Sequence, residues 1–207
     1  GAGLVAGGLD IVQWKNVLTI TIVLILAPFM GLIGSFMVTK ISYLLSRGAT
    51  PKVNKLFKAL QICSSMTFAL SHCTNDAQKT MGIITFSLIV LGLYKPTGDA
   101  FIPNWVIIAC AASITLGIAL GGKAVISTIG MDIYRIKPIN GFSAEGAGAG
   151  VIYLATLFGL PVSTTHIISG AVMGTGAAER VKAVRWGQSA NIFVVWLITI
   201  PSTVIAS

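Results

Sequence analysis

The sequence predicts an all-α membrane protein, a polytopic helical bundle in which some helices are broken or re-entrant. Three observations lead to this fold class: 55% of the 207 residues are hydrophobic, only 10% are charged, and the mean hydropathy is +0.88. A water-soluble domain carries about 25% charged residues, so this chain cannot cover its surface for water. The formal charge of +8 suits basic loops on the cytoplasmic side of a bilayer better than it suits a nucleic-acid partner.

The apolar runs divide the chain into membrane segments, because a spanning helix needs about 20 mostly apolar residues. Basic residues cluster at 47–58, 123–137 and 180–185, and we expect all three connections on the cytoplasmic side. We expect one transmembrane domain over 1–207, with a junction at 1–16, a long helix at 17–45, a broken helix pair at 54–94, a helix at 104–121, a helix plus re-entrant half-helix at 141–178, and a last helix at 186–206.

The first predicted interruption lies at residues 71–80, which are mostly polar and are flanked by two hydrophobic pieces that are each short for a span. This pattern is typical of a helix broken within the membrane. It contains Thr74, Asn75 and Asp76. A charge at the bilayer centre costs about 2.5–3.5 kcal/mol, so Asp76 must face protein, water or a counter-ion. The simpler alternative is an internal ion pair with Lys79, one helical turn away.

The second predicted interruption follows Pro161, where Ser163, Thr164 and Thr165 precede another short apolar piece. Proline favours the first turn of a helix and Ser or Thr can cap it, so this segment suits the start of a half-helix. In broken helices, half-helix N-termini point amide groups at anions and unwound carbonyls hold cations. Alternatively, the hydroxyls bond back to their own helix. Glu145, upstream in the same apolar region, must likewise be paired or hydrated.

Two histidines, His72 and His166, adjoin the interruptions, and a lone histidine in such a place is more often a hydrogen-bonding wall residue than a metal ligand. Ser163 and His166 at helical spacing raise the alternative of a membrane-embedded hydrolase. Neither an oxyanion hole nor an orienting acid accompanies them by spacing, so that signal is weak. A channel or a scaffold, with the interruptions acting in packing, is the third alternative.

Several segments resemble the inorganic phosphate transporter (PiT) family. The stretch from Thr74 to Gly82 looks like its Asn-Asp signature, and the stretch from Pro161 to His166, followed by Gly170, is similar to its second signature. Residues 141–145 match its intramembrane glutamate segment. The similarity extends over essentially the whole chain.

Members of that family are secondary symporters built from two related halves of opposite orientation, each with an Asn-Asp break. This sequence has the break once, so the resemblance implies the C-terminal half of such a transporter. It implies a protein that is not an enzyme but a secondary active transporter of the cell (plasma) membrane, multi-pass, which couples inorganic phosphate uptake to a cation, with Na⁺ favoured. Proton-coupled transport of phosphate or metal-phosphate, and sulfate symport, are the alternatives.

With this resemblance, we hypothesise that phosphate lies between the two interruptions, bound by Asn75, Asp76, Ser163, Thr164 and Thr165. Asp76 either accepts the P–OH proton of phosphate, which sulfate lacks, or neutralises a sodium ion. The cation-binding or coupling residues are then Thr74, Asn75, Asp76 and Glu145, with sodium at Asn75, Asp76 and Glu145.

The expected partners follow from the same hypothesis. They are inorganic phosphate, Na⁺ or H⁺, the lipid bilayer, the N-terminal half of the same transporter and, in a homo-oligomer, further copies of the chain. We expect no nucleic-acid partner and no cofactor, and sodium enters as a co-transported ion.

Overall fold

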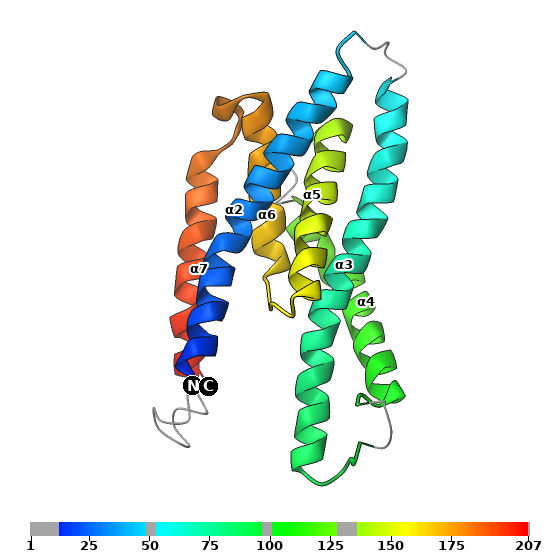
Figure 1. The fold of residues 1–207 in the computed structure, drawn as a ribbon, viewed down its shortest axis with the longest axis vertical. Helices are drawn as coiled ribbons and strands as arrows, with labels where there is room; N and C mark the ends of the chain where they lie inside the picture. The colour runs from blue at the N-terminus through cyan, green and yellow to red at the C-terminus, as the bar shows by residue number, and fades with distance from the viewer. Residues whose placement is uncertain (1–12, 49–52, 97–100, 128–135, 207) are drawn as a thin grey trace.

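A computed structural model describes residues 13–48, 53–96, 101–127 and 136–206, and every regular element within these ranges is helical (Figure 1). The predicted all-α fold is therefore confirmed. The elements are α2 (Trp14–Leu45), α3 (Val53–Val90), α4 (Asn104–Ser127), α5 (Pro138–Leu157), α6 (Thr164–Glu179), the short 3₁₀ helix η3 (Val181–Ala183) and α7 (Trp186–Ala206). The predicted junction at 1–16 lies almost entirely outside the described residues.

Two of the described helices, α2 and residues 104–122 of α4, are long and apolar enough to cross a bilayer. Many apolar side chains of α2 are exposed, for example Leu18 at 62% and Met37 at 59%. Buried positions on α2 are small or polar residues such as Ala27, Gly31 and Ser35. This is the reverse of a soluble helix, and it follows because lipid, not water, solvates the outer face of a membrane bundle.

Helix α3 corrects the predicted broken helix pair at 54–94, because it runs without interruption through residues 71–80. Its 38 residues extend about 57 Å at 1.5 Å per residue. The segment 53–81 contains neither Gly nor Pro, so nothing in the backbone stops the helix. Its polar side chains instead find hydrogen-bond partners, either on neighbouring helices or in the backbone of α3 itself. For example, Ser71 Oγ donates to the Thr67 carbonyl at 3.0 Å.

A break does occur between α5 and α6. Helix α5 ends at Leu157, the chain turns at Gly159 with a φ of +65°, and α6 begins at Thr164. Glycine tolerates this left-handed backbone without a steric penalty. The two helices lie side by side and both pack against α2, which crosses α6 (Figure 1), so the N-terminus of α6 lies inside the bundle.

Small residues allow α6 to approach α2 closely. A Cβ at Gly170 would overlap the Pro28 carbonyl, and a Cβ at Gly174 would overlap the Leu32 carbonyl. Ser35 Oγ donates to the Ala171 carbonyl at 2.7 Å across the same contact. Gly170 and Gly174 thus form a small-xxx-small contact, the usual means of close helix packing in membranes. This contact fixes α6, and with it the start of α6, against the long α2.

Candidate functional site

Three side chains on one face of α3 meet at the carboxylate of Asp76. His72 Nε2 lies 3.0 Å from Asp76 Oδ2, and Lys79 Nζ lies 3.4 Å from Asp76 Oδ1. Their spacings of four and three residues place all three on the same face of a continuous helix. The ion pair between Asp76 and Lys79, expected as the simpler alternative, is therefore present, and it is part of a larger cluster.

The start of α6 forms the opposite wall of this cluster. Thr164 Oγ1 lies 3.4 Å from Asp76 Oδ2 and 3.3 Å from His72 Nε2. Lys79 Nζ donates to the Val162 carbonyl, in the irregular backbone just before α6, at 2.6 Å. The two polar segments that the sequence analysis singled out, 88 residues apart at Asp76 and Thr164, thus meet in space.

Asn75, the neighbour of Asp76 on α3, is buried, with only 4% of its surface exposed. Its Nδ2 donates to Thr156 Oγ1, near the end of α5, at 3.2 Å. Its Oδ1 is buried without a hydrogen-bond partner among the described residues. A buried acceptor without a partner costs about 1–3 kcal/mol, so this carbonyl oxygen is a candidate ligand for a donor or a cation.

Glu145, on α5, is held from α3 by two hydroxyl donors. Ser64 Oγ donates to Glu145 Oε2 at 2.7 Å and Ser65 Oγ donates to the same oxygen at 2.9 Å. Glu145 lines a cavity of about 780 Å³ together with His72 and Thr165. His72 therefore connects the Asp76 cluster to the cavity of Glu145. The cavity also contacts Gly121 and Gly122 on α4, so α3, α4, α5 and α6 all contribute to its walls.

The remaining predicted residues have different positions. Ser163 is the N-cap of α6, and its Oγ accepts from the His166 backbone amide at 3.4 Å. Thr165 lines the cavity. Thr74 is exposed, and within the described residues its side chain makes no hydrogen bond to the cluster. The His166 side chain hydrogen-bonds to the backbone of Leu24 on α2. Ser163 and His166 therefore form a helix cap, not a nucleophile and base.

Five residues that were not predicted as site residues contribute here: Ser64, Ser65, His72, Lys79 and Thr156. The helical spacing of His72 from Asp76 was a signal in the sequence, since four residues make one turn of an unbroken helix. Glu145 contacts Ser64, and Asn75 contacts Thr156, across the interface of α3 and α5. These contacts join residues far apart in the sequence, so a local sequence pattern could not predict them. In the part of the chain that the structure describes, no group of three or more His, Cys, Asp or Glu side chains is arranged to hold a metal ion.

Comparison with known proteins gives three similarities. Residues 45–207 match the phosphate transporter family, PHO4. The chain is 41% identical over 202 residues to a probable low-affinity inorganic phosphate transporter of Bacillus subtilis, covering 97% of this chain and 60% of that protein. It is 40% identical to a protein of the same description from Rhizobium meliloti, covering all of this chain and 62% of that protein. The chain thus spans about three fifths of the length of these relatives.

A solved structure described as the sodium-dependent phosphate transporter has the same fold. It superposes with a TM-score of 0.78 over 96% of this chain and 66% of the other, at 24% sequence identity. At that identity, the likeness establishes the helical arrangement alone.

Proposed function

Since this chain belongs to the phosphate transporter family, we propose that it forms the C-terminal half of a secondary active transporter that moves inorganic phosphate across the cell membrane with a cation. The family consists of transporters, so the chain is not an enzyme. The single observation that supports the proposal best is the meeting of Asp76, on α3, with Thr164, at the start of α6. The proposed transporter also contains an N-terminal half, which this chain does not include.

The start of α6 supplies donors for an oxyanion. By helix geometry, the first amides of α6, at Thr164 and Thr165, have no carbonyl partner within the helix. The helix dipole adds a partial positive charge at this end. The hydroxyls of Thr164 and Thr165 lie beside these amides, and Ser163 fixes the first turn by capping it. In this proposal, phosphate binds here, opposite Asn75 and Asp76.

Lys79 provides the positive charge that such a site needs. Its ammonium contacts one carboxylate oxygen of Asp76 and one backbone carbonyl, that of Val162. A carboxylate plus an unwound carbonyl is the ligand combination that broken helices offer to Na⁺. The lysine therefore acts as a built-in cation and cancels the charge of Asp76. A phosphate ion then meets no net negative charge on this wall.

The exchangeable cation is better accommodated elsewhere. Glu145 has no basic partner in the described residues and lines the cavity next to His72 and Thr165. Oxygen ligands suit hard cations such as Na⁺, and the same carboxylate could carry a proton instead. We therefore propose Glu145 as the coupling residue, and the unpartnered Oδ1 of Asn75 as an additional ligand near the substrate.

Uptake into liposomes tests the proposed function. The full-length protein is reconstituted and radiolabelled phosphate uptake is followed under an imposed Na⁺ gradient, an imposed pH gradient, or neither. Accumulation above the equilibrium level under one gradient supports a symporter and identifies the coupling ion. Flux that only equilibrates phosphate would indicate a channel and overturn the proposal.

A second measurement addresses selectivity. Asp76→Asn removes the carboxylate acceptor but keeps the size of the side chain. If Asp76 accepts the P–OH proton, this variant loses its preference for phosphate over sulfate by at least tenfold. Retained phosphate uptake with unchanged exclusion of sulfate would remove that role from Asp76.

A further inference from the structure

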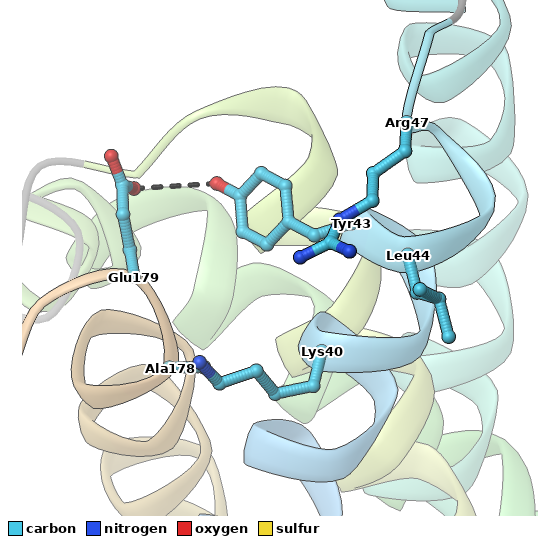
Figure 2. A pocket seen from close by; sticks show the side chains of 6 residues that line it. All are labelled: Lys40, Tyr43, Leu44, Arg47, Ala178 and Glu179. Atoms are coloured by element: carbon cyan, nitrogen blue, oxygen red, sulfur yellow. Dashed lines mark hydrogen bonds between the residues drawn. The ribbon is translucent and has the colours of Figure 1, made fainter.

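A second cavity, with charged residues in its lining, lies at the other end of α6, away from the candidate transport site. It has a volume of about 510 Å³ and is lined by residues from the ends of α2 and α6: Lys40, Tyr43, Leu44, Arg47, Ala178 and Glu179 (Figure 2). Helix α6 has 16 residues, so its two ends are about 23 Å apart. This cavity therefore cannot be part of the Asp76 cluster.

The acidic residue of this cavity is already neutralised. Glu179 receives hydrogen bonds from Lys137 Nζ, from Asn140 Nδ2 at 3.1 Å and from Tyr43 Oη at 3.4 Å. The dashed line in Figure 2 marks the bond from Tyr43, which lies between the two helices. This network joins α2, α5 and α6, and it sets one positive charge and two further donors against the carboxylate of Glu179.

Two basic side chains of the cavity have no acidic partner within the described part of the chain. Lys40 extends from α2 toward α6 at Ala178, and the guanidinium of Arg47 turns back toward Tyr43 (Figure 2). The Lys40 ammonium lies 5.6 Å from the centroid of the Phe36 ring, one turn away on the same helix. With Glu179 balanced by Lys137, the cavity has an excess of positive charge and suits an anion.

The surroundings of the cavity indicate which anion. Lys40 and Leu44 lie one turn apart on α2, and Arg47 follows in the turn just after the helix ends at Leu45. The apolar residues Met37 and Ile41 of α2, 59% and 56% exposed, lie beside them. A basic head group site next to an exposed apolar stripe matches an amphiphile. A free phosphate ion would use only the basic part.

The position in the bundle is consistent with a lipid head group. The ends of α2 and α6, the start of α5 and η3 all lie at the same end of the molecule (Figure 1). That end also carries Lys182 and Arg185. Excess Lys and Arg mark the cytoplasmic side, and the inner leaflet is rich in anionic lipid.

We propose that the cavity between the ends of α2 and α6 binds the phosphate head group of an anionic phospholipid, with Lys40 and Arg47 as its ligands. The acyl chains then lie along the apolar stripe of α2. Since Tyr43 connects the cavity to α5 and α6 through Asn140 and Glu179, a bound lipid stabilises the packing of the three helices.

The test measures lipid binding to the purified full-length protein. Phosphatidylglycerol is titrated against the protein in detergent, and bound lipid is counted by native mass spectrometry, with phosphatidylcholine as the neutral lipid. The variant is K40Q/R47Q, and the matched control is K182Q/R185Q, which removes two positive charges at the same end but outside the cavity. The single variant Arg47→Gln, at an exposed position, provides the same comparison if the double variant is poorly folded.

The expected result is a loss of about thirtyfold in phosphatidylglycerol affinity for K40Q/R47Q, since each hydrogen bond lost to the bound phosphate at an exposed site lowers the affinity roughly fivefold. The control lacks contact with the bound head group and should stay within about twofold of the unmodified protein, and Arg47→Gln should lose about fivefold. Equal losses in variant and control would mean that general charge, not this cavity, binds the lipid. Displacement of the lipid by millimolar inorganic phosphate would mean that the site takes free phosphate. Either result overturns the proposal.

Discussion

Replacing Lys79 with glutamine tests the idea that this chain carries its own cation at the phosphate site. The change removes the charge of an ammonium that contacts Asp76 Oδ1 at 3.4 Å and the Val162 carbonyl at 2.6 Å. Glutamine retains a donor for the carbonyl but leaves Asp76 without its neighbouring positive charge. The wall that faces phosphate then changes from neutral to negative.

The magnitude follows from the geometry. A hydrogen bond to a charged group contributes about 1.5–3 kcal/mol. The side chain of Lys79 is 39% exposed, so solvent screening places the effect at the low end, about 1.5 kcal/mol. Every 1.4 kcal/mol corresponds to a factor of ten, so we expect the KM for phosphate to rise roughly tenfold at low Na⁺. At high Na⁺ the difference should shrink, because the ion can occupy the oxygens that the ammonium has left.

The assay is phosphate uptake into proteoliposomes at several Na⁺ concentrations, with two controls. Lys79→Arg keeps the charge and should stay within about threefold of the unmodified protein. Lys95→Gln, in the segment after α3, removes the same charge at an exposed site away from the cluster and should leave KM unchanged. If Lys79→Gln transports with an unchanged KM at low Na⁺, the lysine does not act as a built-in cation and the argument fails.

Three further predictions follow from the packing and from the other polar contacts. Gly170→Leu should prevent stable folding, because even its Cβ would overlap the Pro28 carbonyl. Overpacking typically costs about 1–3 kcal/mol, and here the overlap is with backbone atoms, which cannot rotate away. Thermal unfolding in detergent measures this, and Gly146→Leu, at a position with nothing within 4 Å of the added Cβ, should unfold within about 2 °C of the unmodified protein. Glu145→Gln should abolish uptake against a gradient while phosphate exchange across the liposome continues; gradient-driven accumulation by this variant would exclude Glu145 as the coupling residue. Thr156→Val removes the hydroxyl that fixes Asn75 and should weaken phosphate binding about fivefold, by the roughly 1 kcal/mol of one hydrogen bond, measured by calorimetry; unchanged affinity would show that Asn75 needs no positioning.

The local sequence correctly predicted a break in the helix before α6, but it wrongly predicted a second break within α3. At Pro161–Thr164 the backbone itself carries the signal, because Pro, the preceding Gly159 and a Ser cap all act within a few residues. At residues 71–80 only side-chain polarity suggested a break, and polarity does not determine backbone conformation. The absence of Gly and Pro from 53–81 was the better indicator, and it favoured a continuous helix.

The sequence by itself determined the solvent and the fold class of this protein, and it picked out Asp76, Thr164 and Glu145 as residues whose polarity needs an explanation. These conclusions depend on composition and on short-range pattern, which are properties of the chain alone. Only the tertiary structure decided which groups contact these polar side chains. Lys79 and His72 lie around Asp76, Ser64 and Ser65 donate to Glu145, and Thr156 lies beside Asn75. The reason is physical, since a polar side chain in an apolar chain demands a partner, but helix packing selects the partner.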